Sequence, residues 1–386
     1  MDQTVREFLH LLGAAVGGVR LPEGFSVTDS GSLLSLAVRQ GLAGAILPPL
    51  KDAGLLDDGA AAPFLDARLE GIRATTLLSH ELSRIRAVLD GAGIDYVPLK
   101  GAHLRSLWPS PWMRTSCDID VLIREDALSL ATEAIAEGLG YSLRTVGFRD
   151  CSLYSPGDSV HLEIHFSLRD TEGRLPALGA AWDYAERIGD THEHCFLPHF
   201  EIFYLLSHLL GHVNTGGGGI RPVIDLALLR REPYDAAALA VLLAECGLSR
   251  FAEVVFALGD AILSGGEIEG VCAALADWLI LGELYGEIHR RALVGRVKRQ
   301  SRTARLARRR YVIRRLFPKR RELAIAYPVL QKHAWLYPVC VLRRLFRLVF
   351  GGRLLVALRR RRAANEIRNV PLDTAESLFS ALGIGD

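Results

Sequence analysis

Two aspartates, two residues apart, are the part of this sequence best suited to chemistry. Asp118 and Asp120 flank Ile119, and an apolar run continues from Val121 to Ile123, which is the pattern of a buried strand. Side chains two apart on a strand point to the same face, so the two carboxylates would lie side by side. Carboxylates that close repel each other unless a cation lies between them. Mg²⁺ suits such a pair, because it combines a few carboxylates with water and phosphate oxygens.

A lysine–glycine pair upstream could bind phosphate. Lys100 and Gly101 follow an apolar run over residues 94–99, which predicts a strand that turns into a short helix. Backbone N–H groups at such a turn bind anions, Gly101 permits close approach, and Lys100 adds charge. Arg105 lies about one turn into the helix, and Arg114 stands just before the aspartate strand, so both are candidates for phosphate binding. The alternative for each arginine is an ordinary surface charge.

A third carboxylate is expected at Glu163. In the run from His161 to Phe166, polar and apolar residues alternate, so His161, Glu163 and His165 share one face of a strand. A glycine turn followed by an Asp-x-Asp strand is the ground plan of a metal-dependent nucleotidyl transferase, in which Glu163 would hold the metal that activates the hydroxyl of the acceptor. His165 would lie on the acceptor side, where it would orient Glu163 or contact the nucleotide. A solvated polar face is the alternative for the strand, and a structural hydrogen bond is the alternative for His165.

Two further histidines stand on a predicted helix. His208 and His212 are four residues apart and share a helical face, and no H-E-x-x-H glutamate lies between them, so a zinc site is not expected. We assign them to the acceptor side, with a core or surface role as the alternative. Gly216–Gly219 lacks the lysine of a P-loop and predicts a flexible hinge. Arg221 and Asp225, also four apart, are expected to form a helix-surface pair.

These motifs resemble the uncharacterised nucleotidyltransferase family of the polymerase-β-like nucleotidyltransferase superfamily. The resemblance extends over about residues 30–345, and only the block over residues 97–125 is specific. Better-known members of the superfamily carry Gly-Ser where this chain has Gly101-Ala102, and the gap from the glycine to the first acid is longer here. The similarity rests on Leu99-Lys100-Gly101, Leu104-Arg105, Trp108-Pro109, Arg114, the strand from Asp118 to Ile123, the strand from Val160 to His165, and His208, His212, Arg221 and Asp225.

The resemblance implies a reaction and a set of roles. It implies two Mg²⁺ ions, for which Mn²⁺ can substitute, and transfer of a nucleoside monophosphate from an NTP, expected to be ATP, with release of pyrophosphate. The acceptor would be a hydroxyl of a small molecule or a peptide. Alternatives are transfer to RNA or protein, or a non-catalytic scaffold that binds nucleotide. The implied catalytic and metal-binding residues are Asp118, Asp120 and Glu163, and the implied nucleotide-binding residues are Lys100, Gly101, Arg105 and Arg114.

The order of predicted elements indicates an α+β fold. Helical spacing dominates the first 92 residues, a compact mixture of strands and helices follows, and helical spacing returns from about residue 198. The expected layout is an N-terminal helical region over 1–92, a nucleotidyltransferase core with a small mixed sheet over 93–197, a helical domain over 198–290 and a basic helical C-terminal region over 291–386.

Composition sets the expected compartment. The 386 residues include six cysteines without a C-x-x-C pair, so neither a disulfide framework nor a zinc site is expected. The first residues lack a basic lead followed by an apolar run, and no uninterrupted apolar stretch reaches the ~18 residues of a membrane span. A cytoplasmic protein is the expectation.

Charge is distributed unevenly along the chain. Residues 288–362 hold 24 Lys and Arg and one acid, Glu322, which gives +23 against −21 for the remainder. Such separation predicts that the basic region binds something acidic. We rank docking on the acidic remainder or on a partner first, binding to an anionic membrane surface second, and binding to RNA third. The second option would make the protein peripheral to a membrane.

Overall fold

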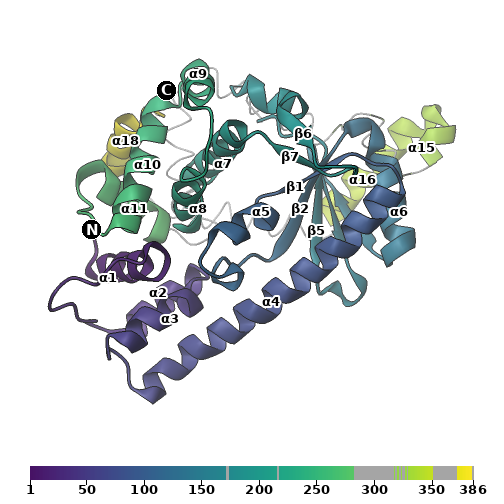
Figure 1. The fold of residues 1–386 in the computed structure, drawn as a ribbon. Helices are drawn as coiled ribbons and strands as arrows, with labels where there is room; N and C mark the ends of the chain where they lie inside the picture. Colours follow the sequence, from purple (N-terminus) through teal and green to yellow (C-terminus); the bar gives the residue numbers. More distant parts are fainter. Residues whose placement is uncertain are drawn as a thin grey trace.

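A computed structural model describes residues 1–170, 174–214, 217–281, 317, 320, 323, 327, 329–350 and 372–384. It confirms the expected α+β class, because a five-stranded mixed sheet lies between helical regions that precede and follow it in the chain (Figure 1).

Three of the four N-terminal helices begin at aspartate caps. The helices are α1 (Gln3–Leu12), which ends in a π-helical turn, α2 (Ser30–Arg39), α3 (Ala43–Asp52) and α4 (Asp58–Gly91). The side chains of Asp2, Asp29 and Asp57 accept backbone N–H groups at the starts of α1, α2 and α4, which satisfies donors that have no partner inside a helix. The 34-residue α4 is a long rod that reaches from the helical half of the molecule to the sheet (Figure 1).

The sheet has one parallel pair at its centre. Its strand order is β1-β2-β5-β4-β3, and only β2 and β5 run parallel. Helix α6 (Leu128–Leu139) follows β2 and ends at Gly140, whose φ of +72° closes the helix. The strands are β1 (Tyr96–Leu99), β2 (Asp118–Ile123), β3 (Ser142–Val146), β4 (Asp150–Tyr154) and β5 (His161–His165).

The two faces of the sheet differ in character, and alternation along the strands sets the difference. Ile119 and Val121 of β2 and Leu162 and Ile164 of β5 enter a buried cluster with α4 and α6. That packing anchors the strands on one face and leaves the acids and histidines of β2 and β5 on the other. The alternation of polar and apolar residues that the sequence shows in β2 and β5 therefore corresponds to the two faces of the sheet.

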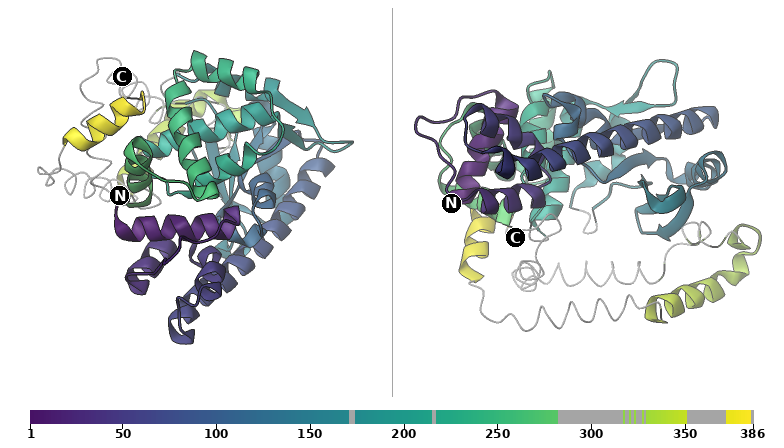
Figure 2. Two further views of the ribbon diagram at one scale, coloured as in Figure 1. Left: turned by 60° about the vertical axis from the view of Figure 1, so that its left-hand side comes forward. Right: turned by 90° about the horizontal axis from the view of Figure 1, so that it is seen from below.

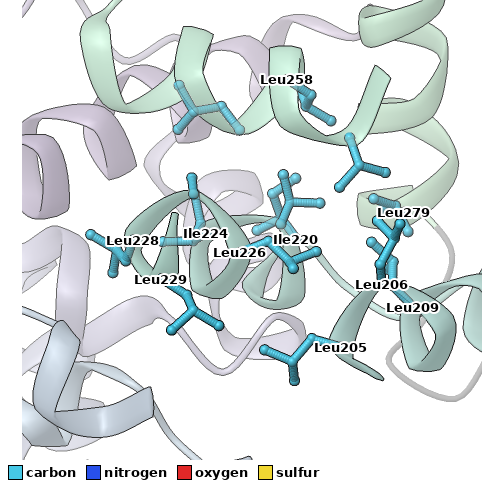
Figure 3. Packing of buried hydrophobic residues seen from close by; sticks show 14 of the residues in the cluster. Leu205, Leu206, Leu209, Ile220, Ile224, Leu226, Leu228, Leu229, Leu258 and Leu279 are labelled. Carbon is cyan, nitrogen blue, oxygen red and sulfur yellow. The ribbon is translucent and has the colours of Figure 1, made fainter. Parts of the chain in front are cut away.

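The helical half has its own apolar core. Helices α7 (Pro198–Val213), α8 (Arg221–Leu229), α10 (Ser249–Ser264) and α11 (Gly270–Leu281) pack through leucine and isoleucine side chains (Figure 3). Helix α9 (Ala236–Glu245) packs against α7 and α10.

The N-terminal helices share this core. Residues of α1, α2 and α3 belong to the same buried cluster as α7, α8, α10 and α11. The buried amide of Gln40 donates to the carbonyl of Ile280 at 3.0 Å and accepts the N–H of Ile220 at 3.0 Å. The helices that precede the sheet and the helices that follow it therefore share one core. The expected boundary at 92/93 falls in the turn between α4 and β1.

Smaller elements complete the described chain. Short helices form at Gly101–Leu104 (α5), Arg105–Leu107 (η2), Pro111–Met113 (η3), Glu125–Ala127 (η4), Pro156–Asp158 (η5) and Pro176–Tyr184 (η6), and a hairpin pairs β6 (Ala185–Arg187) with β7 (His194–Phe196). Near the C-terminus lie α15 (Val329–Lys332), η8 (Ala334–Leu336), α16 (Tyr337–Phe350) and α18 (Leu372–Ala381) (Figure 2). Much of the basic region over residues 288–362 lies outside the described residues, so its predicted docking stays a prediction. Among the described helices, none combines the length and apolar character that a membrane crossing needs.

Candidate functional site

The parallel pairing of β2 and β5 brings the predicted acids together. Asp118 pairs with His161, and Asp120 pairs with Glu163, across the two strands. Oxygens of Asp120 and Glu163 and a ring nitrogen of His165 all lie within 4.8 Å of one another. Among the described residues this is the group of His, Cys, Asp and Glu close enough to hold a metal ion, and Asp118 is not part of it. Asp118 lies close enough for its charge to act on the same cluster.

Lys100 reaches this cluster from an unusual backbone conformation. Its φ is +50° and its ψ is −93°, outside the regions that side-chain-bearing residues favour. From there its Nζ lies 3.2 Å from Oδ2 of Asp120. Burial works against the charge of Lys100, but Tyr204, Asp120, Asp118 and Glu163 together raise its pKa above the ordinary value. Lys100 is therefore a buried cation held by the site's acids.

His165 bridges two of the carboxylates. Its Nε2 lies 2.9 Å from Oδ1 of Asp120 and 3.3 Å from Oε2 of Glu163. Burial lowers the pKa of His165, but hydrogen bonds to Asp120 and Glu163 outweigh it and raise the pKa to about 9. At neutral pH the ring is therefore positively charged, and the N–H group at Nε2 donates to the two carboxylates. The sequence placed His165 on the acceptor side, and the structure places it between two predicted metal ligands.

The two aspartates differ in their electrostatics. Burial and the neighbouring Asp120 charge raise the pKa of Asp118. Burial also opposes the charge of Asp120, but Lys100 and the hydrogen bond from His165 hold the pKa of Asp120 well below its usual range. Lys100 and His165 therefore offset the negative charge of Asp120 in the metal-free protein, whereas burial and the charge of Asp120 still disfavour the negative charge of Asp118.

Helix α7 supplies the opposite wall of the site. Tyr204 is 6% exposed and lies close enough to Lys100, Asp120 and Glu163 for their charges to act on its hydroxyl. Burial raises the pKa of Tyr204 to about 12, so its hydroxyl stays protonated. Burial, Lys100 and His212 lower the pKa of His208 well below its usual value, so His208 is neutral at physiological pH. The rings of His208 and His212 make an edge contact with centroids 4.5 Å apart.

A partly unsatisfied donor group adjoins Gly101. The Nε of Arg105 donates to the Gly101 carbonyl at 2.6 Å, while Nη1 of Arg105 is buried without a hydrogen-bond partner among the described residues. The Oγ of Ser116 is buried and similarly unpartnered in the described chain. A Cβ on Gly101 would lie 3.1 Å from Nη2 of Arg105 and 3.6 Å from Oγ of Ser116. Donors without partners beside a helix N-terminus suit an anion.

Arg114 occupies a different environment. Its Nε and Nη2 donate to the two carboxylate oxygens of Asp225, each at 2.8 Å, and Nε1 of Trp108 donates to Asp225 at 2.9 Å. Asp225 is 2% exposed, so the predicted helix-surface pair of Arg221 and Asp225 is wrong. Arg221 instead donates to the Thr115 carbonyl. The phosphate-binding role of Arg114 stays a prediction, and the geometry favours a structural role.

The glycine run after α7 is a packed turn over its described residues. Gly217, Gly218 and Gly219 are buried. A Cβ on Gly218 would lie 2.6 Å from Cβ of His212, so only glycine fits against that histidine. The predicted hinge is thus a close contact that holds the end of α7 in place.

Two residues of the site were not anticipated from the sequence. Tyr204 lies one helical turn before His208, and that spacing is the signal that could have found it. Asp150 pairs with His165 across β4 and β5, and burial and the Glu163 charge raise its pKa. Alternation with the buried Cys151 and Leu153 would have placed Asp150 on the same face as Glu163.

The donor set fits a divalent metal that prefers oxygen. Asp118, Asp120 and Glu163 offer carboxylates on adjacent strands, and the repelled charge of Asp118 is relieved only by a proton or a cation. A nitrogen of His165 suits zinc or a late transition metal better than magnesium. The three carboxylates, without the His165 nitrogen, form the all-oxygen donor set that Mg²⁺ or Mn²⁺ favours.

Comparison with known proteins agrees with this geometry. The model of the family described as "Uncharacterised nucleotidyltransferase" matches residues 26–264, which include every site residue discussed above. The match ends before the basic region, so it is shorter at that end than the resemblance over about residues 30–345. Neither a curated protein nor a solved structure matches the chain. The match covers more than half of the sequence, and the chain belongs to the uncharacterised nucleotidyltransferase family.

Proposed function

We propose that this protein transfers a nucleoside monophosphate from an NTP, with ATP as the first candidate, to a hydroxyl of a small molecule or peptide. The observation that carries the proposal is the in-register pairing of Asp120 with Glu163, beside the Lys100–Gly101 turn, in a nucleotidyltransferase-family chain. Two adjacent strands that bear acids, next to buried hydrogen-bond donors that could bind phosphate, suit metal-assisted phosphoryl transfer.

Asp118, Asp120 and Glu163 would hold Mg²⁺, with Mn²⁺ as a substitute. When bound, the metal would supply Lewis-acid stabilisation of negative charge on the phosphates. His165 would remain outside the oxygen ligands and hold the Asp120 and Glu163 carboxylates in place through Nε2, as it does in the metal-free protein.

Gly101, Arg105 and Lys100 would bind the triphosphate. The unpartnered Nη1 of Arg105 is a preorganised donor, and the backbone of Gly101 lies beside it. The ammonium of Lys100 is charged and lies 3.2 Å from Asp120. From there it would bind phosphate oxygens of an NTP whose metal is held by the acids.

The acceptor would bind between the acids and α7. Its hydroxyl oxygen forms a bond to the α-phosphorus, the bond from that phosphorus to the bridging oxygen breaks, and pyrophosphate leaves with the electron pair. The hydroxyl proton passes to the Glu163 carboxylate. The neutral ring of His208 and the protonated hydroxyl of Tyr204 would orient the acceptor by hydrogen bonds.

Pyrophosphate release tests the proposal. Each NTP is incubated with the protein and Mg²⁺ in the presence of sugar, polyol and hydroxyl-bearing peptide pools, and parallel samples contain EDTA. We expect release with at least one NTP, its loss in EDTA and its loss in Asp120→Asn. Asp126→Asn, which changes an exposed aspartate near the sheet, serves as the matched control. Absence of nucleotide binding with every NTP in Mg²⁺, or full turnover by Asp120→Asn, would refute the proposed site.

A further inference from the structure

A second surface of the protein lies near the C-terminus, on η8 and α16. Trp335, Val339 and Leu342 are 74%, 56% and 66% exposed. Val339 and Leu342 lie three residues apart on one side of α16, and Trp335 lies in η8, directly before that helix. Exposed apolar side chains in such a row indicate a binding surface.

The opposite side of α16 is already packed. Cys340 and Val341 are buried against Leu323 and Leu330, and these four residues form a cluster separate from the two larger cores. In the right-hand view of Figure 2, α15 and α16 lie at the edge of the molecule, away from α1 to α3. The local cluster therefore orients α16, and its row of exposed apolar residues faces outward from the described part of the chain.

The sequence around this row carries charge of one sign. Residues 323–365 contain nine Lys and Arg and no Asp or Glu. Arg343 is exposed directly after Leu342, and its guanidinium carbon lies 5.9 Å from the ring centroid of Tyr327. Bases beside an apolar row match a surface that has negative headgroups above hydrocarbon.

Other occupants fit less well. A second copy of the same surface would bring like charges together. RNA offers phosphates and flat bases, which suit the bases and Trp335 but leave Val339 and Leu342 without apolar contact. Of these three occupants, a bilayer surface satisfies the basic and the aliphatic side chains at once.

We propose that α16 binds an anionic lipid bilayer and lies flat in its surface. Trp335, Val339 and Leu342 enter the boundary between headgroups and acyl chains, and Arg343 contacts the lipid phosphates. A 14-residue helix is about 21 Å long at ~1.5 Å per residue, too short for a ~30 Å hydrocarbon core, so it lies in the plane of the membrane. This binding would hold the nucleotidyltransferase site near the membrane surface.

Vesicle flotation of the full chain tests the surface. The protein is mixed with phosphatidylcholine vesicles or with vesicles that also contain phosphatidylglycerol. We expect co-flotation with the anionic vesicles alone and its loss at high salt. Leu342→Asp replaces an apolar contact by an acid and should weaken binding about tenfold or more. Arg343→Glu should weaken it while leaving the apolar row intact.

The matched control is Leu69→Asp on α4, where Leu69 is 45% exposed far from the row in sequence. This variant should float as the unmodified protein does. The proposal is overturned if the unmodified chain stays unbound to anionic vesicles at low salt, or if Leu342→Asp floats undiminished. RNA binding in place of vesicle binding would overturn it too. Pyrophosphate release is expected to be unchanged in all three variants, so failure here is distinguishable from failure of the proposed reaction.

Discussion

The ammonium of Lys100 lies 3.2 Å from the Asp120 carboxylate, and it does so from a backbone φ of +50°. Lys100 and Asp158 are the non-glycine residues with positive φ among those the structure describes. Such a conformation costs free energy and persists where surrounding contacts hold it, as they commonly do at functional sites. With His165, Lys100 compensates the Asp120 charge in the metal-free protein. On the adjacent Asp118, burial and the Asp120 charge outweigh the attraction of Lys100, and this difference makes the two acids separable by experiment.

We predict that Asp118→Asn and Asp120→Asn both abolish transfer, but that only Asp120→Asn lowers stability. Each variant removes a carboxylate ligand, so turnover should fall by at least about 100-fold. Because the Asp118 charge is repelled, its loss should leave the melting temperature level or raise it. Loss of the Asp120 charge should lower stability by about 1–3 kcal/mol, because Lys100 and His165 lose their partner. Thermal melts in EDTA beside turnover assays measure both effects, and a shared direction for the two melting shifts would contradict the assignment.

We predict that His165 makes the metal-free protein less stable as pH rises toward 9. Its folded-state pKa of about 9 lies above the value near ~6.5 of an unfolded histidine. The stabilising contribution is therefore full below about pH 6.5 and is lost as pH rises through about 9. It amounts to on the order of 3 kcal/mol. Urea unfolding at pH 6, 7.5 and 9.5 in EDTA should show this slope. His165→Gln should remove it, whereas His80→Gln on an exposed face of α4 should retain it.

We predict that Glu163→Gln impairs chemistry more than nucleotide binding. Lys100, Arg105 and the Asp118–Asp120 pair remain in place to bind the NTP, while the acceptor side loses its carboxylate. Calorimetric NTP affinity should change by less than about threefold and kcat should fall by about 100-fold or more. A large loss of affinity with an unchanged kcat would instead place Glu163 in nucleotide binding.

We predict that Arg105 and Arg114 separate into a ligand-binding and a structural role. Arg114→Met leaves the buried Asp225 charge without its partner, which should cost about 3–5 kcal/mol of folding free energy. Arg105→Met removes a buried donor that lacks a partner at Nη1 but also the Nε bond to the Gly101 carbonyl, so the two effects should offset each other and stability should change little. NTP affinity should fall about tenfold or more in Arg105→Met, because a charge-assisted hydrogen bond is lost. Urea melts and calorimetry on both variants measure this, and weaker NTP binding in a stable Arg114→Met protein would restore that arginine to the phosphate site.

The sequence alone determined the parts of the site that depend on local periodicity. Alternation in β2 and β5 placed Asp118, Asp120 and Glu163 on one face of their strands, because successive side chains on a strand point to opposite sides. Glycine marked the end of α6, because Gly140 readily adopts the positive φ that closes the helix. At the turn after β1 the positive φ instead lies at Lys100, one residue before Gly101. The α+β class followed from the order of helical and strand periods.

Only the tertiary structure decided which separated groups meet. The parallel register of β2 with β5 pairs Asp120 with Glu163, and α7 brings Tyr204 and His208 close enough for the charges of Lys100 and Asp120 to act on them. The partner of Asp225 is Arg114, 111 positions away, rather than the nearby Arg221. These choices depend on packing between elements distant in the chain, where burial leaves each charge only the partners that the fold brings within reach. Local spacing carries no information about those distances, so the role of each arginine became visible only in three dimensions.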